Sequence, residues 1–453
     1  MEFGKEYIKL LDTEEQYNEF RVSNEFLLPN VSYILENRKK IYNKKAKNQY
    51  LTFVAIESGT FKFSGNSIDY SIDSGETWTT LPSDTNTPMV ESGNCIMWKA
   101  SGLTPTSSIG IGIFSSSGRF NVEGNAMSLY YGDDFIGQTD LTGKDYAFRN
   151  LFSGCTKMTS AENMSLPATT LASGCYQIMF RGCTSLTTIP SNLLPATTLT
   201  VNCYQGMFQG CTSLTTAPKL PATTLTVDCY HSMFSSCTSL TTVPSDLLPA
   251  TTLAASCYYS MFYGCTSLTT APELPATTLA SECYRSMLQG CTSLTTAPEL
   301  PVTTLAESCY RSMFYDCTSL TTAPELPATT LAESCYRLMF KNCTSLTTVH
   351  KLPATTLTVD CYYQMFHSCT SLTTAPELPA TTLAVNCYQG MFQGCTNLTY
   401  IKCLATDISA SNCTNSWLSR VAATGTFVKS ASMTDWTTGI SGIPDGWTVQ
   451  DTA

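Results

Sequence analysis

The feature that most constrains this 453-residue chain is a unit of 26 or 28 residues that recurs nine times. Each copy opens with Cys-Tyr, and all but the last end near Leu-Pro, as in "CYRSMFYDCTSLTTAPELP" (309–327). The first cysteines of the nine copies are Cys175, Cys203, Cys229, Cys257, Cys283, Cys309, Cys335, Cys361 and Cys387. Units this short cannot bury a core alone, so we expect them to stack as coils around one continuous core.

Degenerate copies flank the nine full ones. The segment "YAFRNLFSGCTKM" (146–158) has Ala147 in place of the first cysteine, and "SNCTNSWLSRV" (411–421) has Trp417 and Leu418 in place of Met-Phe. A terminal coil has a neighbour on one side only and must cover the core on the other side. Altered end units are therefore expected. We therefore predict eleven coils between residues 146 and 425.

The spacing inside each unit predicts a short helix followed by a short strand. In Cys-Tyr-x-x-Met-Phe-x-x-Cys, the first cysteine, the methionine and the second cysteine stand at i, i+4 and i+8, as on one face of a helix. The following "TSLTTAP" is Thr-rich with an inward leucine, which is typical of a strand closed by proline.

The unit resembles the BspA-like leucine-rich repeat. The matching residues are Met313-Phe314, Cys317-Thr318-Ser319-Leu320 and Leu326-Pro327, with equivalents in each copy. The resemblance implies a right-handed solenoid with parallel strands, and a role in adhesion or recognition rather than catalysis. The chain differs from the family pattern in having methionine for alanine and in adding the first cysteine of each unit.

The cysteines are predicted to belong to the core. On a helix, residues i and i+8 lie about 12 Å apart, too far for a shared metal or a disulfide. Disulfides between stacked coils, about 5 Å apart, are the alternative. The acidic start "MEFGKEYIKLLDTEEQYNEF" contains no secretion signal, so we expect a reducing cytosol and free buried thiols.

Residues 50–135 have a different sequence pattern, in which short strand-like segments are separated by Gly, Ser and Asn. This pattern predicts an Ig-like β-sandwich. Within it, "SIDSGETW" (71–78) resembles the Asp-box of sialidase propellers. In those enzymes the box staples a hairpin and catalysis lies elsewhere. A single box in a region this small therefore predicts a structural hairpin rather than glycan hydrolysis.

Residues 1–49 mix charge with isolated aromatic residues, which predicts an extended arm that becomes ordered on a partner. The part from residue 28 to 43 resembles N-terminal "PNVSY…YN" segments of structural proteins from crAss-like tailed phages of gut bacteria. The resemblance implies anchoring to other virion proteins through Leu28, Pro29, Asn30, Val31, Tyr33 and Tyr42. Residues 426–453, with "DWTTGISGIPDGWTV" (435–449), are predicted to form a C-terminal cap or tail.

Composition disfavours several functional classes. The net charge is −10 with 13% charged residues, and "NRKKIYNKKAK" (37–47) is the one basic run, so we expect no nucleic-acid partner. No apolar run approaches the ~20 residues of a membrane span. Three histidines at unmatched positions favour neither a catalytic nor a metal site. We expect no enzyme activity, no metal and no cofactor.

A binding surface is expected where the repeats differ from one another. Variation concentrates at the second and sixth residues after the first cysteine, which a helix would present outward one turn apart. Tyrosine and arginine there are frequent at binding hot spots, and with Gln and His they suit a glycan. The alternative is drift at exposed positions. The candidate ridge comprises Tyr259, Tyr263, Arg285, Arg311, Tyr315, Arg337, Lys341, Tyr363 and His367.

Together these features predict a mainly β protein with short helices, built from an arm, a β-sandwich and a leucine-rich-repeat solenoid. The expected function is a phage head or tail fibre on the virion surface, assembled in the host cytoplasm and binding a bacterial-surface or mucus glycan. The alternatives are a BspA-type adhesin on the bacterial cell surface and a purely structural capsid decoration. Fibres are often trimeric, so a homotrimer is included, although no heptad stalk is present.

Overall fold

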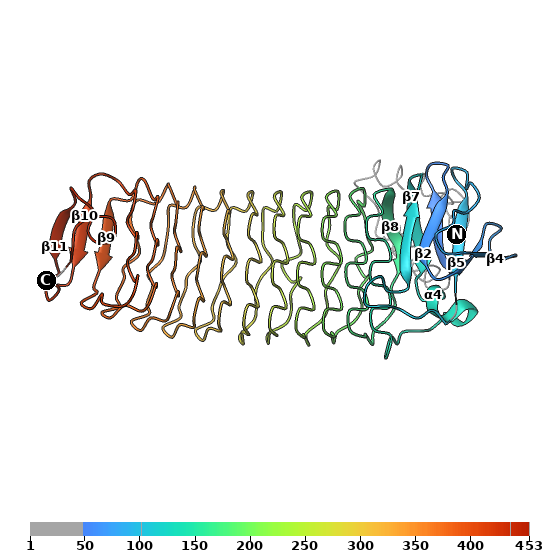
Figure 1. The fold of residues 1–453 in the computed structure, drawn as a ribbon, viewed down its shortest axis with the longest axis horizontal. Helices are drawn as coiled ribbons and strands as arrows, with labels where there is room; N and C mark the ends of the chain where they lie inside the picture. Colours follow the sequence, from blue (N-terminus) through green and yellow to red (C-terminus); the bar gives the residue numbers. More distant parts are fainter. Residues whose placement is uncertain (1–48, 101, 435, 453) are drawn as a thin grey trace, which may run out of the picture.

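The computed structural model describes residues 49–100, 102–434 and 436–452. Over these residues the protein is mainly β, with one short α-helix. The N-terminal sheets lie at one end of a row of coils, and a small sheet lies at the other end (Figure 1). The leucine-rich repeats therefore form the long middle part of the molecule.

Two sheets make up the N-terminal part. The first has six strands in the order β4-β3-β5-β1-β7-β8, and the second pairs β2 with β6. Their bounds are β1 Leu51–Ala55, β2 Phe61–Gly65, β3 Ile68–Ser71, β4 Thr79–Leu81, β5 Cys95–Lys99, β6 Gly112–Ser116, β7 Phe120–Asn125 and β8 Met158–Ser165. An Ig-like sandwich is not confirmed, because β8 comes from the first coil and pairs with β7 in parallel.

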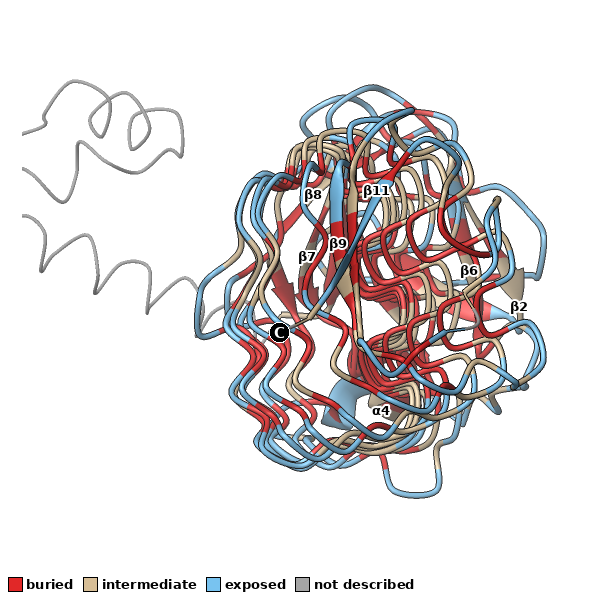
Figure 2. Cartoon of the chain, turned by 90° about the vertical axis from the view of Figure 1, so that its left-hand side faces the viewer, coloured by how far each residue is buried: buried red, intermediate tan, exposed pale blue. Residues whose placement is uncertain are grey.

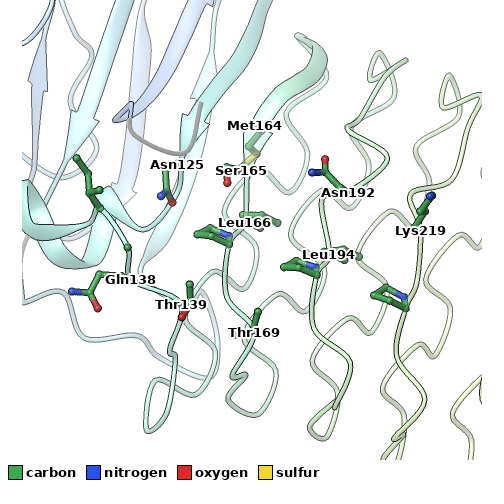
Figure 3. A pocket seen from close by; sticks show the side chains of 15 residues that line it. Asn125, Gln138, Thr139, Met164, Ser165, Leu166, Thr169, Asn192, Leu194 and Lys219 are labelled. Atoms are coloured by element: carbon green, nitrogen blue, oxygen red, sulfur yellow. The ribbon is translucent and has the colours of Figure 1, made fainter. Parts of the chain in front are cut away.

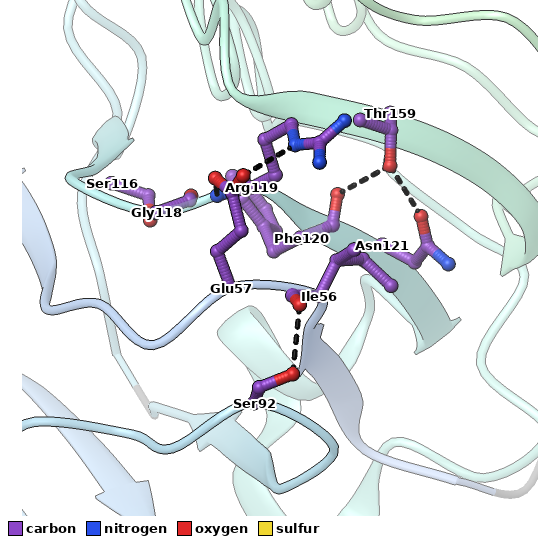
Figure 4. A network of polar contacts seen from close by, with 9 residues as sticks. All are labelled: Ile56, Glu57, Ser92, Ser116, Gly118, Arg119, Phe120, Asn121 and Thr159. Carbon is purple, nitrogen blue, oxygen red and sulfur yellow. Dashed lines mark hydrogen bonds and ion pairs between the residues drawn. The ribbon is translucent and has the colours of Figure 1, made fainter.

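The N-terminal sheets and the first coil share one core and one hydrogen-bond network. The α-helix α4 (Ser128–Tyr131) and the 3₁₀ turn η1 (Gly132–Asp134) follow β7. On the first coil, the Thr159 hydroxyl donates to the Asn121 side chain at 2.7 Å (Figure 4). Beside it, Arg119 Nε donates to Glu57 at 2.9 Å. The first coil is thus covered by the sheet rather than exposed.

The Asp-box segment forms the structural hairpin that the sequence predicts. The Ser71 hydroxyl donates to Asp73 at 2.6 Å, and the Thr77 amide donates to the same carboxylate at 3.0 Å. These hydrogen bonds lower the pKa of Asp73 to about 2. The Trp78 ring packs 5.0 Å from the Tyr50 ring. The box therefore ties together the turn between β3 and β4.

The segments predicted as helices are instead chains of overlapping turns. Alternate amides bond within the coil, as Met287 N donates to Tyr284 O at 3.2 Å. The amides between them bond to the next coil, as Ser286 N donates to Arg311 O at 2.8 Å. The helix prediction is wrong for these segments.

A repeat of four residues explains this conformation. Every fourth residue has a positive φ, as at Glu282 (56°), Ser286 (53°) and Gly290 (74°). Each of these residues turns the chain. As a result, two residues whose side chains point into the core are followed by two whose side chains point away from it. Gly, Ser, Asn and Asp dominate these positions because they tolerate the left-handed region better than other residues.

The predicted strands of the middle coils are reduced to single parallel bridges. Thr296 bridges both Thr270 and Thr322, one coil away on either side. Prolines follow closely in each "TTAPELP" and cannot donate to a ladder, so longer pairing is lost. True strands return at the C-terminal end, where β9 (Tyr400–Cys403), β10 (Thr426–Lys429) and β11 (Thr448–Asp451) pair in parallel.

Stacked aromatic columns fill the core. In the end view, buried residues recur at the same places on successive coils (Figure 2). Neighbouring rings lie 5.8 Å apart between Tyr284 and Tyr310 and 5.4 Å apart between Phe314 and Phe340. At the C-terminal end Trp417 extends the tyrosine column and Trp436 stacks on it at 5.5 Å. These rings cover the last coil, as expected for a terminal unit.

All the cysteines are free, and every one except Cys95 is buried. The second cysteine of a unit donates a weak hydrogen bond to the preceding coil, as Cys343 Sγ does to Phe314 O at 3.1 Å. Burial raises the pKa of the Cys265 thiol to about 12. The prediction that the repeat cysteines are core residues is confirmed.

We predict that Ile178→Gly raises the free energy of unfolding by about 1 kcal/mol, because Ile178 has a strained φ of 50°. Denaturant unfolding measures this change. In a helix the same substitution would instead lower stability by about 1 kcal/mol. As a control, Gly390→Ala should destabilise, since its φ is 60° and a Cβ would lie 2.9 Å from Gln364 Cγ.

Alkylation of the native protein at mildly alkaline pH should be confined at early times to Cys95, the one half-buried thiol. The buried thiols are inaccessible and remain protonated, so they should react only after unfolding in denaturant. Mass spectrometry counts the labels, and a Cys95→Ser variant provides the control. Rapid labelling of the repeat cysteines in the native state would contradict the structure.

Candidate functional site

The candidate ridge lies along one side of five successive coils in the middle of the array. Its residues occupy two outward positions of the four-residue turn pattern, the second and sixth after the first cysteine. Among the described coils outside this stretch, the same positions carry mainly Gln, Ser and Asn. The structure thus brings the nine predicted residues onto a single face, although they lie on turns and not on helices.

The second position forms a column that we call the arginine column, composed of Arg285, Arg311 and Arg337, with Tyr259 before it and Tyr363 after it. The Arg285 guanidinium lies 5.1 Å from the Tyr259 ring centre, and that of Arg337 lies 4.0 Å from the Tyr363 ring. These cation–π contacts cover faces of both tyrosine rings. The column therefore presents mainly hydrogen-bond donors to a ligand.

The sixth position forms a second column, composed of Tyr263, Gln289, Tyr315, Lys341 and His367. Tyr263 is the most exposed large side chain of the ridge, at 42%. The Lys341 ammonium lies 5.6 Å from the Tyr315 ring centre and donates to Gln364 at 3.0 Å. Tyr263 is consequently the ridge aromatic with the most accessible ring.

Two carboxylates at this site were missed by the sequence analysis. Glu282 pairs with Arg285 of its own coil, and Asp360 of the next coil pairs with Arg337. Both precede a first cysteine, a position where the other units carry Ser, Asn or Gly, apart from Asp228 before Cys229. Of the three acids in this column, these two stand in or next to arginine-bearing coils, and that was the available signal.

A groove lies at the junction of the N-terminal part and the first coils. Figure 3 shows this groove of about 580 Å³, with Gln138 on one side and Leu166 and Leu194 of successive coils on the other. Prolines of three coils, Pro167, Pro195 and Pro221, are among its lining residues. Of the described residues that line it, Lys219 alone is charged.

The remaining sequence predictions concern virion anchoring, metal binding and membrane spans. Leu28 to Tyr42, predicted to anchor the protein, lie outside the described residues. Within the described residues, no group of three or more His, Cys, Asp or Glu side chains is arranged to hold a metal ion. No helix among them is long and apolar enough to cross a membrane.

His367 should make the stability depend on pH. Burial and the nearby cations Lys341 and Arg420 lower its pKa, so folding favours the neutral imidazole. The stabilisation is complete above the ordinary pKa of about 6.5 and is lost as the pH falls below it. His367→Gln should therefore reduce the drop in melting temperature on acidification. Gln393→Ala, in the next coil, should leave that drop unchanged, and an equal drop in both variants would contradict the assignment.

Comparison with known proteins identifies the family of the repeats. The family described as "BspA type Leucine rich repeat region (6 copies)" matches residues 146–295, 203–338, 249–373 and 307–431, which together cover more than half of the chain. No curated protein and no solved structure gave a significant match. Repeats of this type are typical of surface-exposed, adhesin-like proteins. The chain belongs to the BspA type leucine-rich repeat family.

Proposed function

We propose that this chain is a non-enzymatic surface protein whose repeat solenoid, with its parallel strands, adheres to a bacterial-surface or mucus glycan through the ridge from Tyr259 to His367. One observation carries the proposal. Arginine, lysine and tyrosine gather at the two outward positions of adjacent middle coils, whereas the outer coils carry mainly small or amide side chains there. Drift alone would not concentrate the residue types of binding hot spots in adjacent coils.

The proposed carrier is a phage virion, with the protein forming a head or tail fibre. The support is the resemblance of residues 28–43 to phage structural proteins. In this proposal residues 1–49 bind other virion proteins and the repeats project outward. The competing location is the bacterial cell surface, which the family itself favours. Antibody labelling of phage particles and host cells, viewed by electron microscopy, distinguishes the two locations.

Replacing Tyr263, Arg311, Tyr315 and Lys341 together by Ala should reduce binding to host cells or mucus about tenfold or more, because hot-spot truncations cost about 2 kcal/mol or more each. These four side chains are chosen because none of them makes an ion pair within the described residues. Binding of the labelled protein to cells, measured by flow cytometry, tests this.

The matched control replaces Gln205, Gln209, Gln389 and Gln393 by Ala, which alters the same two columns outside the charged stretch. This variant should bind like the original protein, and both variants should melt at similar temperatures. Equal binding by the two variants would remove the ridge from the function and favour a purely structural decoration.

A further inference from the structure

Arg311 stands at the centre of the arginine column without an ion-pair partner among the described residues. Backbone bonds hold the column in register: Ser286 N donates to Arg311 O, and Ser312 N to Arg337 O, each at 2.8 Å. The adjoining tyrosine rings repeat at 5.8 and 6.0 Å, which sets the spacing between coils. Three positive charges therefore repeat at close, regular intervals.

The two outer arginines form ion pairs, whereas the central one forms none with the residues that the structure describes. Glu282 pairs with Arg285, and Asp360 pairs with Arg337. In the coils of Arg311 and Arg337, the residue before the first cysteine is a buried serine, Ser308 or Ser334. No carboxylate is therefore supplied to Arg311 from that position.

The electrostatic cost of this arrangement falls on Arg311. Burial and the positive charges of Arg285 and Arg337 lower its pKa, against a smaller opposing effect of Glu282. A bound anion would offset the cost of holding this half-buried cation between two others. The planar guanidinium is suited to bind a carboxylate through two parallel hydrogen bonds.

Neighbouring residues restrict which anion fits. Glu307 and Glu333 are exposed two residues before the first cysteines of these coils. Together with Glu282 and Asp360 they add negative charge to the coils that carry or adjoin the column, which disfavours densely charged polyanions. Tyr263, with 42% of its surface exposed, offers an apolar ring face beside the column. Aromatic faces of this kind pack against sugar rings.

We propose that Arg311 binds the carboxylate of an acidic sugar in a glycan with sparse charges, with Tyr263 packing against a neighbouring sugar ring. This inference rests on the proposed function and names its ligand class. The glycan lies along the array, because the donors of the ridge form columns in that direction. Densely sulfated glycans and nucleic acids are expected to be poor ligands because the four carboxylates on these coils repel them.

The test measures binding of the full chain to a hyaluronan oligosaccharide, which carries one carboxylate for every two sugars, to its neutral methyl ester and to a heparin oligosaccharide by calorimetry. We expect the hyaluronan oligosaccharide to bind at least about tenfold more tightly than the other two, and Arg311→Gln to abolish that preference. Arg311→Lys should retain part of it, since lysine keeps the charge without the planar fork. Gln389→Ala, in the same column, should have no effect.

Melting temperatures separate a ligand-binding role from a structural one. Without ligand, Arg311→Gln should melt at the same or a higher temperature, because it removes a repelled charge; a structural role would lower it. Equal binding of the acid and its ester, no binding of the hyaluronan oligosaccharide, or unchanged binding by Arg311→Gln would overturn the inference. Ridge-dependent binding to cells would then still support the proposed function, whereas loss of both would overturn the function as well.

Discussion

Backbone hydrogen bonds between neighbouring coils determine the position of almost every other group in this protein. In the turn segments alternate amides donate to the next coil, and this geometry needs a left-handed residue at every fourth position. Each coil therefore repeats the backbone of the one before it. As a result, equivalent side chains lie directly above one another, and a position in the repeat becomes a column in space.

The columns differ in their energetic consequences. Stacked tyrosines, phenylalanines and cysteines bury apolar surface, and each new coil extends the same core. Stacked arginines repel one another, so the arginine column is stable only with compensation. Glu282 and Asp360 compensate its two ends, and the tyrosines beside them contribute cation–π contacts. The same register that builds the core thus creates a line of evenly spaced donors, a geometry suited to a polymeric ligand.

The ends of the array are closed in different ways. At the N-terminal end β8 of the first coil joins the six-stranded sheet, and Phe152 stacks on Phe114 at 5.8 Å. At the C-terminal end Trp417 donates to Gly442 O at 3.0 Å and stacks against Trp436. At both ends, large aromatic rings pack against the terminal coil. There they cover the last ring of an aromatic column.

Much of this organisation follows from the sequence alone. The number of units, their register, the buried cysteines and aromatics and the outward ridge are all visible from self-comparison, because each repeat copies its neighbour. The local conformation of each unit does not follow from the spacing of its residues alone. Spacings of four and eight residues fit both a helix and the observed turns, and the Gly, Ser, Asn and Asp residues at every fourth position were the signal that separates them. Only the tertiary structure decided that the strands of the middle coils shorten to single bridges and that β8 pairs with β7. It also decided that Arg337 pairs with Asp360, while Arg311 has no ion-pair partner in the described part of the chain. Those outcomes depend on how each coil is positioned relative to the next one, and the sequence of a single unit does not specify this.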